Sequence, residues 1–182
     1  DYTGRNNGTI VGGAEQTIDG AMGRAMEFDG ESGYVNAGSG DSFDLTDSIT
    51  ISAWIKPNGW TGDIQNLVSK SSSYRLRHDG INFQFSFYNG ATRSGDWSSP
   101  PEQGVWTHVV ATYDRVNIKT YSNGVLNTST DQDRVLITNT ADFIIGALHN
   151  PGAGISGYFN GSIDDVMIFN RSLSAEEVAA LY

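Results

Sequence analysis

Short runs in which apolar and polar residues alternate occur along almost the whole chain. The clearest run is Ser48–Lys56 (SITISAWIK), where Ile49, Ile51, Ala53 and Ile55 take every second position. Successive side chains of a β-strand point to opposite faces of a sheet, so this run predicts a strand with one apolar face.

Similar runs, separated by turn-forming residues, predict many further strands. The pairs Asp79-Gly80 and Asn123-Gly124 each stand between two such runs, and Asp-Gly and Asn-Gly are typical of tight hairpin turns. The predicted strands are Arg24–Asp29, Tyr34–Ala37, Gln65–Lys70, Tyr74–His78, Asn82–Tyr88, Val105–Tyr113, Asn117–Ser122, Val125–Ser129, Asp142–Ile145 and Tyr158–Phe169.

Only one segment, Ser174–Leu181, has helical character. Ser174 followed three residues later by Glu177 forms the pattern of a capping box, which marks a helix start. About a dozen regularly spaced strands with one short C-terminal helix predict an all-β, two-sheet antiparallel sandwich.

Composition narrows the class of protein. A length of 182 residues suits a single domain. The net charge of −10 argues against nucleic acid and anionic membranes as partners but permits cation binding. The absence of cysteine excludes disulfides, zinc thiolates and thiol nucleophiles. No apolar run is long enough for a membrane span, so we expect no membrane insertion.

The predicted last strand contains two adjacent carboxylates, Asp164 and Asp165. Because neighbouring side chains point to opposite faces, one carboxylate must point towards the core, and the pattern does not say which. A buried carboxylate needs a partner, and no lysine lies nearby in sequence. Calcium, which takes oxygen ligands, would satisfy it, with Asp29 beside Gly30 as a second ligand source. Hydrogen bonds from backbone amides, a tyrosine or an arginine are the alternative.

Two arginines share one face of a predicted strand. Arg75 and Arg77 alternate with the residues of the other face, and Arg93 would join them if the following strand pairs back. Arginine binds carboxylates and sulfates in bidentate fashion. With Tyr88 and Trp97 nearby in sequence, the group predicts a site for an acidic sugar. The alternative is that these arginines pair with the abundant surface aspartates.

Trp60 and Trp97 stand in polar segments predicted to be loops. A large ring in a loop is either a lid on the core or a platform on which a sugar stacks, and the sequence leaves both open. Catalysis is not expected. The carboxylate patterns of glycan hydrolases of this fold are missing, as are a nucleophile elbow, a phosphate loop and a zinc-protease motif.

Five segments, in order, resemble the laminin-G-like, concanavalin A-like jelly-roll domains. They are GRAMEFDGESGYVNAG, SITISAWIKP, WTHVVATYD, YSNGVL and GSIDDVMIFNRSLSAEEVAALY. The resemblance covers essentially residues 1–182, which we expect to be one domain excised from a larger protein. It implies a jelly-roll sandwich with one convex and one concave sheet, in a family where many members bind calcium and many bind carbohydrate.

The resemblance also implies a metal site. In the resembling domains a structural calcium commonly sits where the N-terminal segment, an early loop and the last long strand converge. Carried onto this sequence, the ligands would be Asp165 first, then Asp29 and the Gly30 carbonyl, with Asp1 as a fourth. Asp164 competes with Asp165 for the role.

We therefore expect a non-catalytic, calcium-stabilised, lectin-like module of a secreted or cell-surface protein. Its partners would be a polysaccharide or glycoconjugate, acidic ones included, and the neighbouring domains of the parent protein. The alternative is a protein-interaction, adhesion or spacer domain without a sugar ligand. The expected ligand-binding residues are Trp60, Arg75, Arg77, Tyr88, Arg93 and Trp97.

Overall fold

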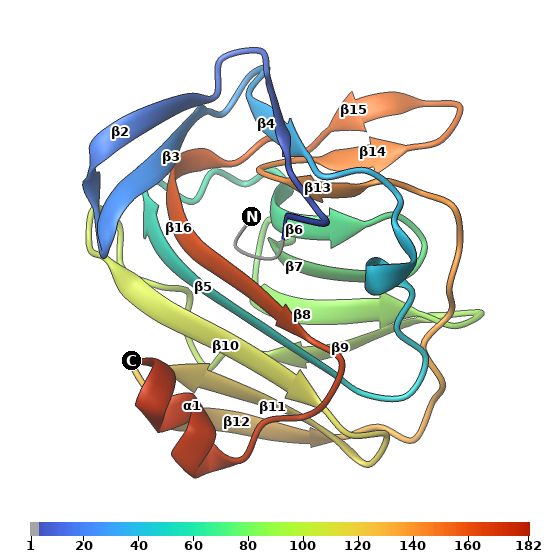
Figure 1. Ribbon diagram of the computed structural model, residues 1–182. Coiled ribbons are helices and arrows are strands. Elements are labelled where there is room, and N and C mark those ends of the chain that lie inside the picture. The colour runs from blue at the N-terminus through green and yellow to red at the C-terminus, as the bar shows by residue number, and fades with distance from the viewer. Residues whose placement is uncertain (1–3) are drawn as a thin grey trace.

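The computed structural model describes residues 4–182 as two stacked antiparallel sheets (Figure 1). Sheet A has the order β1 (Thr9–Val11), β4 (Tyr34–Asn36), β13 (Phe143–Ile145), β6 (Gln65–Lys70), β7 (Tyr74–His78), β8 (Phe83–Tyr88) and β9 (Thr92–Asp96). Sheet B has the order β12 (Val125–Asp131), β11 (Asn117–Ser122), β10 (Thr107–Tyr113), β5 (Ile49–Pro57), β16 (Asn160–Phe169), β3 (Gly23–Asp29) and β2 (Glu15–Gly20).

Three smaller elements complete the fold. A separate hairpin, β14 (Leu148–Asn150) and β15 (Gly154–Ser156), lies at the upper right of Figure 1. A short 3₁₀ helix, η1 (Asp41–Phe43), precedes β5, and helix α1 (Ala175–Leu181) covers part of sheet B. Within residues 4–182, no helix has the length and apolar character that a bilayer crossing requires.

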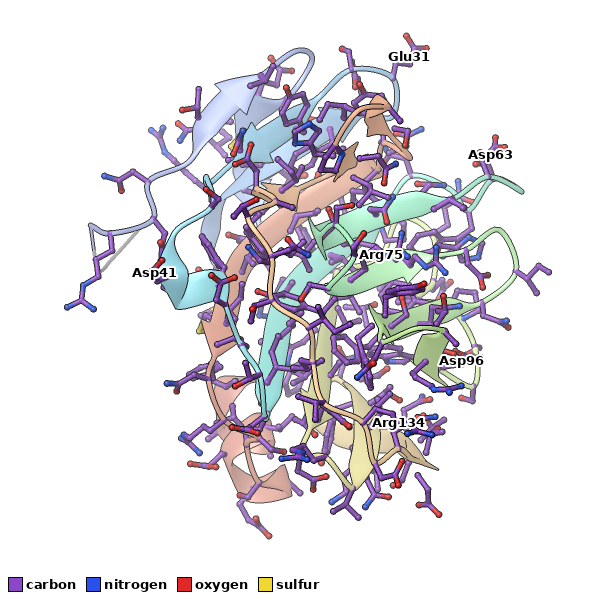
Figure 2. All side chains as sticks on the ribbon, turned by 90° about the vertical axis from the view of Figure 1, so that its right-hand side faces the viewer. Glu31, Asp41, Asp63, Arg75, Asp96 and Arg134 are labelled. Atoms are coloured by element: carbon purple, nitrogen blue, oxygen red, sulfur yellow. The ribbon has the colours of Figure 1, made fainter. Side chains whose placement is uncertain are left out.

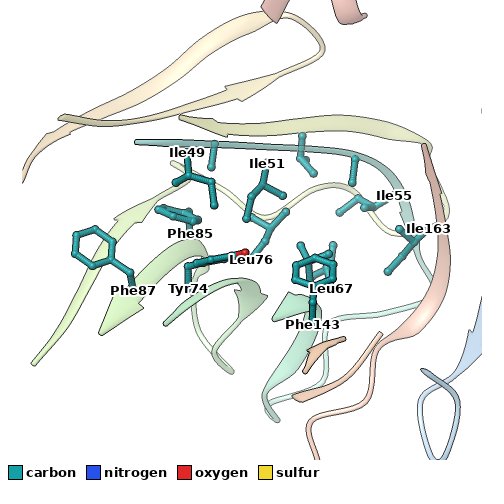
Figure 3. Close-up of a cluster of buried hydrophobic side chains, with 14 of the residues drawn as sticks. Ile49, Ile51, Ile55, Leu67, Tyr74, Leu76, Phe85, Phe87, Phe143 and Ile163 are labelled. Carbon is teal, nitrogen blue, oxygen red and sulfur yellow. The ribbon is translucent and has the colours of Figure 1, made fainter. Parts of the chain in front are cut away.

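The main core lies between the sheets, and the alternation in β5 points into it as predicted. Ile49, Ile51 and Ile55 are fully buried and face Leu76 and Phe85 of sheet A (Figure 3). Non-polar side chains removed from water on both inner faces are the main force that holds the two sheets together.

The outer face of sheet B is also partly buried, which the polar residues of β5 did not predict. Thr50 is covered by the chain leading to α1: its hydroxyl donates to the Arg171 carbonyl at 2.8 Å and accepts from the Leu173 amide at 3.0 Å. Leu173 and Val178 form a second small core with Val110 and Tyr121. The C-terminal segment therefore completes the domain rather than trailing from it.

The predicted turns and helix start are confirmed. Asn123 and Gly124 both have positive φ angles, 50° and 76°. A type I′ turn, such as the one that joins β11 to β12, requires positive φ at both central residues. Helix α1 begins with the predicted capping box, in which the Ser174 hydroxyl accepts from the Glu177 amide at 3.2 Å. Local sequence signals thus decide these connections.

One lysine is fully buried in sheet A. The Lys70 ammonium lies 3.3 Å from an Asp44 carboxylate oxygen and donates to the Ala141 carbonyl at 2.8 Å. Asp44 follows η1, and a third of its side chain is exposed. The pair fastens the η1 loop and the segment before β13 to β6.

A histidine is fully buried under the C-terminus of the chain. His108 Nε2 lies 2.8 Å from the Ser52 hydroxyl, and its ring contacts those of Trp54 and Tyr182. The other ring nitrogen, Nδ1, has no hydrogen-bond partner among the described residues. Burial lowers the pKa of His108 to about 4, so the ring is neutral at physiological pH.

Candidate functional site

The outer face of sheet A carries polar side chains at its centre. Tyr74, Leu76 and His78 of β7 are buried on the inner side, so Arg75 and Arg77 point outwards, as the alternation predicts. In the register of β7 with β8, Arg75 stands opposite Ser86 and Arg77 stands opposite Gln84. The predicted pairing of these two strands is confirmed, and it places both arginines on one surface.

A cleft of about 790 Å³ opens beside Arg75. Its walls come from the turn after β3, the loop before β6, the β14–β15 hairpin and the segment leading into β16. The lining is mainly polar and includes Gln65, Asn66, Arg75, Asn150, Tyr158 and Asn160. A concave surface with convergent polar groups is the common form of a ligand site.

Arg75 is a half-buried cation without a counter-ion among residues 4–182. Its side chain makes no hydrogen bond or ion pair with any other described residue. Burial, and then the like charge of Arg77, lower the pKa of Arg75 to about 10. The guanidinium is still charged at neutral pH, and it borders the cleft without a counter-ion from the described chain.

Arg77 differs from Arg75 because it has acidic neighbours. Burial lowers the pKa of Arg77, whereas the charges of Asp79 and Asp96 act in the opposite direction. Asp79 is itself tied to the turn before β8, where it accepts from the amides of Ile81 and Asn82. The alternative, that surface aspartates balance the charge of the arginines, therefore holds for Arg77 and does not hold for Arg75.

Several buried polar atoms on this face lack hydrogen-bond partners among the described residues. They are Asn66 Oδ1, Arg77 Nε, Ser86 Oγ and Asp96 Oδ1. Asn66 and Arg77 are direct neighbours across β6 and β7, and Asn66 also lines the cleft, where its amide nitrogen donates to the Gly157 carbonyl at 3.0 Å. Buried polar groups are nearly always paired in native proteins, so pairing these atoms requires an ordered water or a shift of the neighbouring side chains.

The remaining predicted ligand residues divide between the two faces. Tyr88 is exposed at the end of β8 and alternates with inward-facing Phe87, so it lies on the outer face with Arg75. Arg93 is opposite Phe87 in the register of β8 with β9, and its side chain therefore points to the inner side. The expectation that Arg93 joins Arg75 and Arg77 is wrong. The β8–β9 turn sets a register that places Ser94, and not Arg93, opposite outward-facing Ser86.

The two loop tryptophans are lids on the core. The ring of Trp60 stacks on His78 at a centroid distance of 4.8 Å, and its Nε1 donates to the Pro101 carbonyl at 2.7 Å. Trp97 is 4% exposed, its Nε1 donates to the Tyr121 carbonyl, and its ring meets Phe83 edge-on. Of the two alternatives, the structure favours the lid, and Trp97 offers no face to a sugar.

The aspartate pair in β16 sits in a bulge, which breaks the simple alternation. Asp164 is buried opposite Trp54 of β5, whereas Asp165 is exposed with a φ angle of +43°. Asp164 accepts from the Met22 amide at 3.0 Å and from the Asp165 amide at 2.8 Å. The first choice of Asp165 as the buried carboxylate is wrong, and backbone amides hold the buried one, Asp164.

The predicted metal ligands do not meet at one place. Asp29 pairs with Asn160 at the start of β16. Asp165 stands five residues further on, a separation of about 16 Å along a strand. Asp29 already accepts from the amides of Glu31, Ser32 and Gly33 and from the Ser32 hydroxyl. The Ser32 amide above all, and the other donors of this loop, hold its pKa well below the usual range.

Gly30 and Asp1 are the other two members of the predicted metal set. Gly30 is adjacent to Asp29, and its φ angle of +77° turns the chain there. Asp1 lies outside the described residues. Among residues 4–182, no group of three acidic, histidine or cysteine side chains is arranged to hold a metal ion. Of the three predicted ligands within residues 4–182, Asp29 and Gly30 stand together and Asp165 lies apart.

A family model identifies the class of protein to which this chain belongs. A laminin-G family model described as the concanavalin A-like lectin/glucanases superfamily matches residues 29–179, and the chain belongs to this superfamily. The resemblance inferred from the five sequence segments is thereby confirmed. A search of curated protein sequences finds no match.

Several solved structures with a similar fold are binding domains. The binding domain of Paraclostridial Mosquitocidal Protein 1 aligns with a TM-score of 0.79 at 18% identity, over 97% of this chain and 47% of that one. Domain 4 of AbnA, an extracellular arabinanase from Geobacillus stearothermophilus, solved with arabinotriose, aligns with a TM-score of 0.77 at 22% identity, over 96% and 87%. A structure of botulinum neurotoxin type C, whose cell entry is described as dependent on two ganglioside molecules, aligns with a TM-score of 0.75 at 19% identity. That alignment covers 97% of this chain and 46% of the toxin chain. The chain thus spans less than half of the toxin chains it matches.

Proposed function

We propose that this protein is a non-catalytic carbohydrate-binding module, and that the cleft at Arg75 is its binding site. The observation that carries the proposal is the half-buried, unneutralised Arg75 guanidinium beside a polar cleft of about 790 Å³. Sugars present many hydroxyl groups, and the polar side chains that line the cleft offer donors and acceptors for them.

The similar structures support this class of ligand. One was solved with arabinotriose and another is described with ganglioside molecules. Their hosts include an extracellular enzyme, which fits a module carried by a secreted or surface protein together with other domains. A second candidate, a protein-interaction domain, is supported by a similar botulinum neurotoxin domain solved with synaptotagmin II.

The carboxylates around the cleft favour binding over catalysis. A general acid needs a pKa near the working pH, whereas the donors around Asp29 hold its pKa far below that range. Glu31 and Asp63, the other acidic residues of the lining, are exposed. None of the three is enclosed in the way the general acid of a glycoside hydrolase commonly is.

The first test is a glycan array probed with the folded protein. We expect binding to a restricted set of polysaccharides or glycoconjugates, with the signal reduced by Arg75→Gln. Arg24→Gln removes the same charge from an exposed position in β3 of sheet B. This variant serves as the control and should bind normally. A blank array with a cooperatively folded sample would contradict the proposal and favour the protein-interaction candidate.

Calcium stabilisation remains part of the proposal, on the narrower set of Asp29 and the Gly30 carbonyl. The Asp29 carboxylate stays ionised at any physiological pH, as a calcium ligand must. An ion there would have to displace some of the loop donors that Asp29 now accepts from. Stabilisation of the fold by calcium therefore has to be measured.

We expect EDTA to lower the melting temperature and added calcium to restore it, because an ion that binds only the folded state stabilises it. Asp29→Asn should remove the response to calcium, whereas Asp165→Asn, further along β16, should keep it. A melting temperature unchanged by EDTA in the native protein would count against a structural ion. The amide donors to Asp164 and Asp29 would then be sufficient.

A further inference from the structure

We propose that the cleft at Arg75 selects a glycan with an isolated carboxylated sugar, such as a uronic or sialic acid residue among neutral sugars. This inference rests on the proposed function and names the class of ligand for the same site. Three features of the described residues carry it: an unneutralised cation, unpaired atoms around it, and carboxylates on both sides.

The unneutralised cation is the first feature. Arg75 is half-buried, and no carboxylate of the described chain pairs with it. The charge that acts on its pKa is the like charge of Arg77. A partly desolvated guanidinium gains most from a ligand that brings a negative charge. The planar fork of arginine matches the two oxygens of a carboxylate, which a neutral sugar cannot offer.

The unpaired atoms around Arg75 are the second feature. Ser86, directly opposite Arg75, is fully buried, and its hydroxyl has no partner in the part of the chain that the structure describes. Asn66 supplies a free acceptor and Arg77 a free donor on the adjoining positions of the same face. All three atoms are buried, so a sugar acid at Arg75 would reach them with its hydroxyls only after the side chains around them shift.

The flanking carboxylates are the third feature, and they limit the charge of the ligand. Glu31 and Asp63 line the outer part of the cleft, and Asp96 lies beyond Arg77, on the other side of Arg75 in Figure 2. The whole chain has a net charge of −10. A dense polyanion would place several charges against these groups, whereas an isolated carboxylate meets Arg75 and leaves neutral sugars to face the carboxylates.

The test compares matched forms of the same polymers by isothermal titration or biolayer interferometry. The probes are glucuronoxylan, sparsely de-esterified galacturonan and sialylated oligosaccharides, each beside its carboxyl-reduced form, with heparin as the dense polyanion. We expect at least one acidic probe to bind, and carboxyl reduction to weaken its binding about tenfold to a hundredfold, the effect of a charge-assisted hydrogen-bonded pair. Heparin should bind more weakly than that probe.

Variants separate the arginine fork from general charge. Arg75→Gln should bind the intact and the carboxyl-reduced polymer equally, whereas Arg75→Lys should keep a part of the preference because it keeps the charge without the fork. Arg24→Gln should keep the full preference, and thermal unfolding should confirm that all three variants are folded.

Two results overturn the inference and are distinguishable. Binding of a neutral glycan that exceeds every acidic probe, or of heparin above the sparsely charged polymers, would refute an isolated carboxylate as the ligand while the proposed function stands. An array and a probe set without any binding would refute the proposed function, and the acidic ligand with it.

Discussion

Replacing Asp44 by alanine is expected to lower the free energy of unfolding by about 3 kcal/mol, because it leaves a fully buried ammonium group without its ionic partner. Lys70 has no exposed side-chain surface, and Asp44 at 3.3 Å is the one carboxylate that pairs with it among the described residues. Urea unfolding at neutral pH measures the change.

Two further variants isolate the cause. Asp41 is an exposed carboxylate in η1, the short helix that Asp44 directly follows. Its replacement by alanine should change stability by no more than about 0.5 kcal/mol, as is usual at the surface. Lys70→Met should cost less than Asp44→Ala, since Asp44 is one-third exposed and water can solvate it once the lysine is gone. Equal stability of the native protein and Asp44→Ala would show that Lys70 needs no counter-charge there.

Acidification should destabilise the fold by about 3 kcal/mol through His108 alone. Burial lowers the pKa of His108 from 6.5 to about 4. The unfolded chain therefore takes up a proton near pH 6.5, and the folded chain takes it up only near pH 4. The contribution of the neutral His108 ring to the free energy of unfolding is complete above pH 6.5. It is lost as the pH falls from 6.5 to about 4.

The measurement is the free energy of unfolding of the native protein and of His108→Gln between about pH 7.5 and about pH 4. Carboxylates titrate in both proteins, so the difference between the two slopes reports the histidine. We expect a flatter profile for His108→Gln. Parallel profiles for the native protein and His108→Gln would contradict the burial effect.

The strands with strong alternation could be predicted from sequence, and the weak ones could not. β5, β7, β8 and β10 have apolar residues at every second position, and burial of that face decides their place. β9 (TRSGD) and β2 (EQTIDG) are polar edge strands, which form only because a neighbouring strand offers backbone partners.

The candidate site could be predicted only in part, for reasons that individual residues make clear. Arg75 and Arg77 follow from the period of a strand, but the face of Arg93 depends on the β8–β9 register, which its sequence does not determine. Asp164 and Asp165 follow the same period until a bulge breaks it. Asn66 was missed because it lies inside a predicted buried strand, where nothing in the sequence marks an unpaired side chain.

The β14–β15 hairpin was also missed, although it forms one wall of the cleft. Its strands have three residues each, too few for any periodicity to show. The Asn150-Pro151-Gly152 sequence between them is a turn signal that could have indicated it. Short elements of this kind are found from their turns rather than from their strands.

The same hairpin makes the specificity of the cleft separable from the stability of the domain. Leu148 is the one buried apolar residue of its two strands, and the connecting residues 151–153 are exposed. Lengthening a surface loop costs little conformational free energy. Natural variation or directed evolution could therefore remodel this wall for new glycans while the sandwich beneath it stays constant, which makes the hairpin the natural position for a sequence library.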